Sequence, residues 1–205
     1  MLDIQTFIGG IFDTNAYLVE APQGDLLVDA PTGTCEWLSS QNRRPRLLLI
    51  THGHVDHIDD AARIAREFQC PVACHRESVP LLTDPDVFRK LGFNLEVESV
   101  QPSVLIEETA QTTALGLPLQ VLLVPGHCPG SLCFYHRESA NLFSGDTLFA
   151  GSIGRTDLPG GDLPLLLRGL HSKVLVLPDA TRVLPGHGPA TTVGVERRTN
   201  PYLAR

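Results

Sequence analysis

Short apolar segments bounded by turn residues recur along the chain and predict a series of β-strands. The first three are separated by the turn signals Gly9-Gly10 and Pro22-Gln23-Gly24. The continuous apolar run at Arg46–Thr51 is typical of a buried strand. The predicted strands are Leu2–Ile8, Ala16–Glu20, Asp25–Asp29, Arg46–Thr51, Pro71–His75, Ser103–Glu107, Leu117–Val124, Leu132–Arg137, Leu142–Ser144 and Arg182–Leu184.

Apolar residues three or four positions apart predict helices between and after these strands. The predicted helices are Thr34–Gln41, Asp56–Phe68, Asp162–Lys173 and Thr192–Asn200, the last of which stops before Pro201. Ser78–Glu98 is interrupted by proline and glycine, which predicts short helical turns and loop. Strands followed by alternating strands and helices favour an α/β (α+β) fold in which helices cover layers of sheet.

The composition narrows the class of protein. A chain of 205 residues, with 42% hydrophobic and 19% charged residues, predicts one folded domain over residues 1–205. A net charge of −7 argues against a nucleic-acid groove, because phosphate binding needs a basic footprint. No apolar run approaches the roughly 20 residues of a membrane span, and the N-terminus does not resemble a secretory signal. We therefore expect a cytoplasmic protein with reduced cysteines and neither nucleic-acid nor membrane partners.

Residues 51–57 read Thr-His-Gly-His-Val-Asp-His and place three histidines and one aspartate between a predicted strand and a predicted helix. Neutral imidazole and carboxylate are preferred ligands of zinc, iron and manganese, so a divalent ion explains this crowding. Alternate residues of an extended stretch share a side, and His52 and His54 can therefore reach one ion. Asp56 and His57 lie past the bend, at the first helical turn, and can face a second ion.

Three later residues fit the same site. His127, Asp146 and His187 each follow a predicted strand and are set among glycine and proline. Such loops bring the backbone close to a metal without side-chain clash. The sequence therefore offers seven candidate metal ligands, namely His52, His54, Asp56, His57, His127, Asp146 and His187.

An H-x-H-x-D-H motif followed by a lone His, a lone Asp and a lone His resembles the metallo-β-lactamase-fold hydrolases, over nearly the whole chain. The resemblance implies a four-layer αββα sandwich with two divalent metal ions at one edge, zinc first, with iron or manganese as alternatives. It implies one ion held by His52, His54 and His127, a second held by Asp56, His57 and His187, and Asp146 as the bridge. Asp56 is also the candidate catalytic residue.

Within this superfamily the chain is most similar to glyoxalase II-like proteins. Gly145–Phe149, Gly154–Asp162 and Glu196–Pro201 are typical of hydroxyacylglutathione hydrolases and of their short bacterial relatives. The sequence ends 18 residues after His187, so we expect the short form, without the C-terminal helical domain that helps the long enzymes to hold glutathione. Cys128 stands where a threonine is more usual.

The resemblance implies a metallo-hydrolase, a thioesterase that cleaves S-lactoylglutathione or a related acyl thioester with a hydroxide shared by two ions. The expected partner is a small-molecule thioester or glutathione conjugate, and the expected assembly is a monomer or homodimer. A persulfide dioxygenase, with a single iron held by His52, His127 and Asp146, is the alternative on the same fold. Hydrolysis of a lactone, β-lactam or phosphodiester and a non-catalytic binding module are further alternatives.

The remaining reactive side chains are expected to be structural. Cys70 and Cys74 have C-x3-C spacing without a second pair, which favours core or surface thiols over structural zinc. Arg155 is either a fork that binds a phosphate or carboxylate or a buried ion-pair partner of Asp157 or Asp162, and the ion pair is favoured. The lone histidines expected to be structural or on the surface are His75, His136 and His171.

Overall fold

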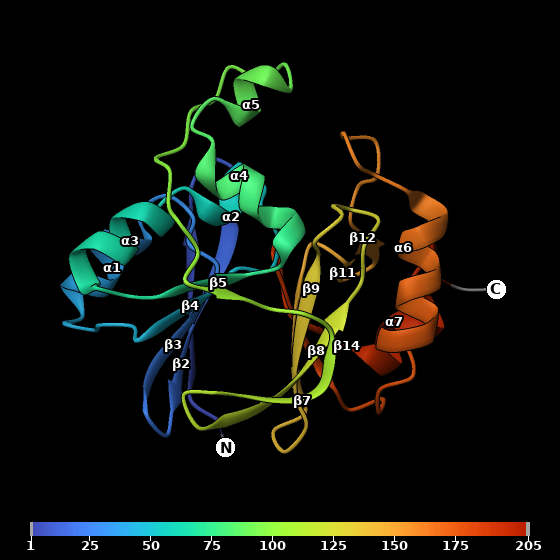
Figure 1. The fold of residues 1–205 in the computed structure, drawn as a ribbon. Helices are drawn as coiled ribbons and strands as arrows, with labels where there is room; N and C mark the ends of the chain where they lie inside the picture. The colour runs from blue at the N-terminus through green and yellow to red at the C-terminus, as the bar shows by residue number, and fades with distance from the viewer. Residues whose placement is uncertain (1, 204–205) are drawn as a thin grey trace.

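The computed structural model describes residues 2–203, which form two six-stranded sheets packed face to face between layers of helices (Figure 1). The first sheet has the order β1-β2-β3-β4-β5-β6, antiparallel from β1 to β3 and parallel from β3 to β6. Its strands are β1 (Ile4–Gly9), β2 (Thr14–Ala21), β3 (Gly24–Val28), β4 (Leu47–Leu49), β5 (Val72–Cys74) and β6 (Val104–Leu105).

The second sheet has the order β14-β13-β10-β9-β8-β7, in which β10 and β13 are parallel and all other neighbours antiparallel. Its strands are β7 (Thr109–Ala114), β8 (Leu117–Leu123), β9 (Leu132–His136), β10 (Asn141–Gly145), β13 (Arg182–Pro185) and β14 (Thr191–Thr192). A separate hairpin of β11 (Leu148–Phe149) and β12 (Ser152–Ile153) follows β10 in the chain.

The helices lie on the outer faces of the two sheets, with α1 and α3 on one side and α6 and α7 on the other (Figure 1). Their bounds are α1 (Thr34–Ser40), α2 (Val55–Ile58), α3 (Ala61–Phe68), α4 (Val79–Thr83), α5 (Val87–Lys90), α6 (Leu163–Gly169) and α7 (Val193–Thr199). A 3₁₀ turn at Arg76–Ser78 precedes α4, and a π-helical turn at Leu170–Val174 extends α6. Among residues 2–203, no helix has the length and apolarity needed to cross a membrane.

Three clusters of buried apolar side chains separate the four layers. One lies between α1, α3 and the first sheet, and includes Leu38, Ile64 and Leu48. The second fills the space between the two sheets, and the third lies between the second sheet and its helices. Alternate residues of β3 confirm this arrangement, because Leu27 faces the first cluster while Leu26 and Val28 face the second. The predicted four-layer αββα sandwich is therefore confirmed.

The structure differs from the prediction in one helix and in four strands that the sequence analysis does not predict, namely β7, β11, β12 and β14. The continuous helix Asp56–Phe68 is wrong, because the chain breaks between α2 and α3 where the N–H of Asp60 donates to the carbonyl of Ala30 at 2.9 Å. Strand β7 is not predicted, because its sequence Thr-Ala-Gln-Thr-Thr-Ala is largely exposed and polar and lacks the alternation of a half-buried strand. Short helical turns in Ser78–Glu98 are confirmed by α4 and α5.

Several strands of both sheets end at one edge of the sandwich. In the first sheet β3 and β4 are parallel, and Asp29 and His52 follow their carboxyl ends. In the second sheet His127, Asp146 and His187 follow β8, β10 and β13, which share one direction. The topology therefore gathers these polar side chains although they are far apart in the sequence.

Candidate metal centre

His52, His54 and His127 form one compact set of nitrogen donors. Nε2 of His52 lies 3.1 Å from Nδ1 of His54 and 3.2 Å from Nε2 of His127. His52 and His127 are buried, and His54 is partly exposed as the N-cap of α2. The extended backbone at His54 lets the loop after β4 turn back, so that His52 and His54 face the same point.

Asp56, His57 and His187 form a second set beside the first. Nε2 of His187 lies 3.1 Å from Oδ2 of Asp56 and 3.4 Å from Nε2 of His57. Asp56 and His57 lie in the first turn of α2, as the sequence predicts, and His187 comes from the loop after β13. Oγ1 of Thr14 donates to Oδ2 of Asp56 at 2.9 Å and fixes the orientation of this carboxylate.

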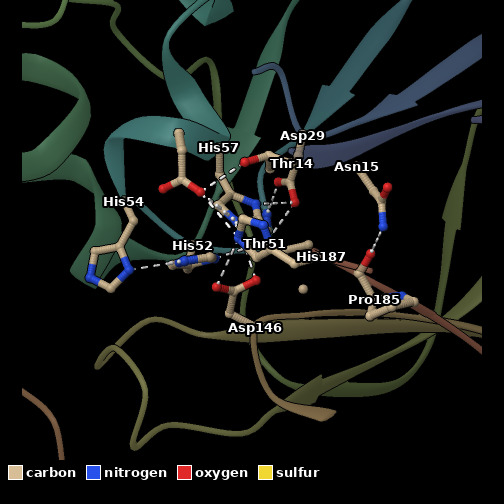
Figure 2. A network of polar contacts seen from close by, with 12 residues as sticks. Thr14, Asn15, Asp29, Thr51, His52, His54, His57, Asp146, Pro185 and His187 are labelled. Carbon is tan, nitrogen blue, oxygen red and sulfur yellow. Dashed lines mark hydrogen bonds and ion pairs between the residues drawn. The ribbon is translucent and has the colours of Figure 1, made fainter. Parts of the chain in front are cut away.

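Asp146 lies between the two sets. Its Oδ1 is 3.2 Å from Nε2 of His57, and its Oδ2 is 3.4 Å from Nε2 of His187 and 3.6 Å from Nε2 of His127. Figure 2 shows His52, His57, His187 and Asp146 converging on one region. The structure thus brings together all seven of the predicted ligands.

In four of the five histidines, the ring nitrogen Nδ1 forms a hydrogen bond to a protein oxygen. Figure 2 shows the partners of two of them, Thr51 beside His52 and Asp29 beside His57. Because Thr51 Oγ1 donates to Asp29 at 2.7 Å, it accepts from Nδ1 of His52, and Asp29 also accepts from Nδ1 of His57. Such partners fix the tautomer and orientation of a metal-binding imidazole. The four distances from Nδ1 are 3.1 Å to Thr51 Oγ1 for His52, 2.8 Å to Asp29 Oδ2 for His57, 2.8 Å to the Arg155 carbonyl for His127 and 3.0 Å to the Phe12 carbonyl for His187.

The first set is electrostatically suited to bind a cation. Burial, together with the neighbouring histidines, lowers the pKa of His52 well below its ordinary value. Burial also lowers the pKa of His54 to about 4, and that of His127 is lowered for the same main reason. These imidazoles are therefore neutral near pH 7 and offer their lone pairs.

In the second set the pKa values of the histidines are raised instead of lowered, because carboxylates surround them. Burial would lower the pKa of His187, but hydrogen bonds to Asp146 and Asp56 raise it to about 10. Burial is similarly outweighed at His57, where Asp146 and Asp29 raise the pKa well above its ordinary value. Burial would raise the pKa of Asp56, but His187, His57 and Thr14 bring it down to about 2.

The donor set fits divalent metal ions. Ligand atoms about 2.0–2.2 Å from an ion stand about 3.0–3.5 Å apart at tetrahedral or octahedral angles, and the spacings above fall close to this range. Oδ1 of Asp146 is buried and forms no hydrogen bond among the described residues, although Nε2 of His57 stands 3.2 Å from it. Such a buried carboxylate oxygen is costly unless a cation faces it. Three groups of donors lie close enough to share an ion: His52/His54/His127, His52/His57/Asp146 and Asp56/His57/His187.

The loop that carries His187 is attached to the first sheet. Nδ2 of Asn15 donates to the carbonyls of Pro185 and Gly188 at 2.9 and 3.0 Å, and Oη of Tyr17 donates to the Pro185 carbonyl at 2.6 Å. A Cβ on Gly186 would stand 2.1 Å from Oδ1 of Asp146. Glycine is therefore required where this loop passes the carboxylate.

The sequence reasoning missed the residues that support these ligands. It assigns Asp29 only to the end of a strand, although an aspartate directly after a buried run is a recognisable signal of a site at a sheet edge. Nothing in the local sequence marks Thr14, Asn15 or Tyr17, because their partners come from α2, from the end of β13 and from the loop after it.

Most of the other reactive side chains lie as expected. Cys70 and Cys74 are buried thiols of the core beneath the first sheet's helices. Arg155 pairs with Asp157 through two hydrogen bonds of 2.8 Å, but the pair is exposed and not buried as expected. His75 accepts the N–H of Glu77 and caps the 3₁₀ turn.

A sequence model of the metallo-beta-lactamase superfamily matches residues 9–187, a range that contains all seven candidate ligands. The chain belongs to this superfamily. A member from Haemophilus influenzae, the hydroxyacylglutathione hydrolase GloC, is 31% identical over 199 residues, covering 94% of this chain and 93% of GloC.

Two solved structures of the superfamily are close in shape as well as in sequence. The B3 metallo-beta-lactamase BLEG-1 superposes with a TM-score of 0.92 and 34% identity, over 99% of this chain and 100% of its own. TTHA1623, solved in a di-iron-bound form, gives a TM-score of 0.86 and 40% identity, over 97% of this chain and 100% of its own. The fold binds divalent metals, and TTHA1623 is a relative with two iron ions bound.

Proposed function

We propose that this superfamily member is a two-metal thioesterase of the glyoxalase II type, with S-lactoylglutathione or a related acyl thioester as substrate. The observation that supports this most strongly is that Asp146 lies between two sets of three ligands, with its Oδ2 3.6 Å from Nε2 of His127 and 3.4 Å from Nε2 of His187. The site opens into a cavity of about 550 Å³, a size suited to a small molecule. The likeness to GloC supports the same substrate class. The completeness of the second set, Asp56, His57 and His187, favours two ions over the single iron of a persulfide dioxygenase.

In this proposal His52, His54 and His127 would hold one ion, Asp56, His57 and His187 would hold the other, and Asp146 would contribute to both. When bound, the two ions would supply a hydroxide nucleophile at neutral pH and Lewis acidity for the thioester carbonyl. Asp56 stays ionised, since its pKa is about 2, and its carboxylate can orient the nucleophile by accepting a hydrogen bond. Thr14 keeps that carboxylate in place, and the leaving thiolate is weakly basic and needs no general acid.

The experiment is turnover of S-lactoylglutathione and S-acetyl-N-acetylcysteamine by the purified protein under nitrogen, with metals quantified on the same sample. Thiol release with about two metals per chain supports the proposal. Oxygen uptake with a persulfide substrate, together with about one iron per chain and no thioester cleavage, contradicts it.

A matched pair of variants links the activity to the site. Asp146→Ala removes the shared carboxylate, so activity and metal retention should fall together. Asp86→Ala changes an exposed aspartate on α5's N-terminal side, which pairs with Arg89, and should leave both at the level of the unmodified protein. Full activity in Asp146→Ala would sink the assignment.

A further inference from the structure

The cavity over the metal centre has apolar walls on both sides. Phe88, Phe93 and Leu95 line it from α5 and the following loop, which cover the first sheet's end of the site. The opposite wall is formed by Phe149 and Ile153 of the β11–β12 hairpin and by the nearby Leu158. The polar lining of the cavity is concentrated at the metal centre itself, which includes His54, His127 and Asp146.

Large apolar side chains remain exposed at the mouth of this cavity. Phe12, at the turn between β1 and β2, is 54% exposed, and Phe93 is 36% exposed. Exposed apolar surface next to a metal site favours a ligand that covers it, because burial of that surface is favourable. Phe88 is nearly fully buried and supports the same wall from behind.

The walls offer little to an anionic group. Among residues 2–203, Arg155 is the one arginine or lysine that lines the cavity. Its Nε and Nη2 both donate to the carboxylate of Asp157, at 2.8 Å each. The guanidinium charge and these two donors are therefore paired with Asp157 and not directed at a ligand. A glutathione conjugate carries two carboxylates, and the described walls hold no free cation for either of them.

We infer that the cavity selects thioesters that carry an apolar group, aliphatic or aromatic, rather than the charged peptide of a glutathione conjugate. The inference rests on the proposed thioesterase activity and specifies its substrate class. The reacting carbonyl lies at the metal centre, and the apolar group lies between the Phe93 wall and the Phe149 wall.

Two matched substrate series test this inference and show which arm of the thioester carries the apolar group. One series lengthens the acyl chain from acetyl to octanoyl on N-acetylcysteamine, and the other lengthens an alkane thiol esterified with acetate. We expect kcat/KM to rise by about fourfold per added methylene in one series until the cavity is filled. We also expect the hexanoyl or hexyl thioester to exceed S-lactoylglutathione in kcat/KM.

A pair of neighbouring variants gives the test its control. Phe93→Ala removes a wall, and should lower the ratio of kcat/KM for the longest and shortest thioesters by about tenfold. Leu91→Ala changes a residue of the same segment that is 42% exposed and does not line the cavity, and should keep the ratio unchanged. Because the ratio compares substrates on one protein sample, it does not depend on how much of the variant folds.

Three results are informative in different ways. A rise with chain length that Phe93→Ala abolishes supports the inference. Cleavage that is independent of chain length in both series, or fastest with S-lactoylglutathione, overturns it while leaving the thioesterase intact. A protein that holds its metals and cleaves no thioester overturns the proposed function itself.

Discussion

Oδ2 of Asp29 lies 2.8 Å from Nδ1 of His57, deep in the sandwich where both side chains are buried. The same carboxylate accepts the N–H and the hydroxyl of Thr51, which in turn accepts from His52. Asp29 therefore orients one histidine from each ligand set. Its backbone adopts φ of 60°, the left-handed region, which aspartate tolerates better than most residues.

Asp29→Asn should weaken metal binding without changing any proposed ligand. An amide offers one acceptor oxygen where three donors converge, so one donor is left facing the NH₂ group. We expect metal affinity to fall by about 10–100-fold, measured as metal retained against a competing chelator. Asp3→Asn, at an exposed aspartate of the N-terminal segment, is the control. Unchanged retention in Asp29→Asn would mean that Asp29 serves folding alone.

The ligands could be predicted from the sequence because each one follows a strand or starts a helix, and the motif carries its own spacing. His127, Asp146 and His187 were found for that reason, and the order of strands and helices predicts the layers. The supporting contacts could not be predicted, because they join segments far apart. Oη of Tyr17 meets the Pro185 carbonyl across 168 residues of sequence, and no local pattern reports such a pairing.

The predicted boundaries of an element are wrong where tertiary contacts outweigh the apolar periodicity of the sequence. The apolar period continues from Ile58 to Phe68, yet hydrogen bonds to Ala30 divide the helix at Asp60. The sequence pattern also does not predict the apolar walls of the cavity, because Phe88 and Phe93 lie in a segment that proline and glycine make irregular.

Gly186→Ala should disrupt the centre sterically. The new Cβ would stand 2.1 Å from Oδ1 of Asp146 and 2.6 Å from Cε1 of His57, so one or both side chains must move. A ligand displaced by about 1 Å can cost on the order of 100-fold in rate, and we expect kcat to fall by at least that factor with loss of metal. Steady-state kinetics and metal analysis measure both.

Gly188→Ala, two residues further along the same loop, is the control for Gly186→Ala. It introduces backbone strain without a steric clash between the new Cβ and a metal ligand. Gly188 has φ of +72°, and no heavy atom lies within 4 Å of the position that a Cβ would take, so alanine meets only the left-handed penalty of about 1–2 kcal/mol. We expect this variant to unfold at a lower temperature while keeping its metal. Equal metal loss in both variants would contradict the steric explanation.

Glu196 of α7 is expected to hold one wall of the cavity in place. This buried side chain accepts from the N–H of Gly151 at 2.9 Å, from Thr191 Oγ1 at 2.6 Å and from Asn200 Nδ2 at 2.8 Å. Gly151 is the turn of the β11–β12 hairpin, whose Phe149 lines the cavity. Asn200, which follows α7, also donates to the carbonyl of Ser152 in this hairpin at 3.0 Å, so the end of this helix holds the cavity wall through two side chains.

Glu196→Gln should raise KM several-fold at unchanged metal content, because a loosened hairpin shifts the wall but leaves the ligands untouched. Replacing one acceptor oxygen by a donor should also cost about 1–3 kcal/mol of stability, measured by denaturant unfolding. Glu138→Gln, at an exposed position of the β9–β10 turn, is the control for both readouts. A fall in kcat with unchanged KM would argue that Glu196 acts on the metal centre instead.

Metal loading of the chelator-stripped protein should release protons at the second set and not at the first. The first set is already neutral at pH 7, since the pKa of His54 is about 4 and burial also lowers those of His52 and His127. His187 is protonated below its raised pKa of about 10 and must lose that proton to bind an ion, so affinity at its set should rise with pH between about 6 and 9. Affinity at the first set should change little in that window. Calorimetric titration in two buffers of different ionisation enthalpy measures the protons released by each ion, and binding of both ions without any proton release would contradict the prediction.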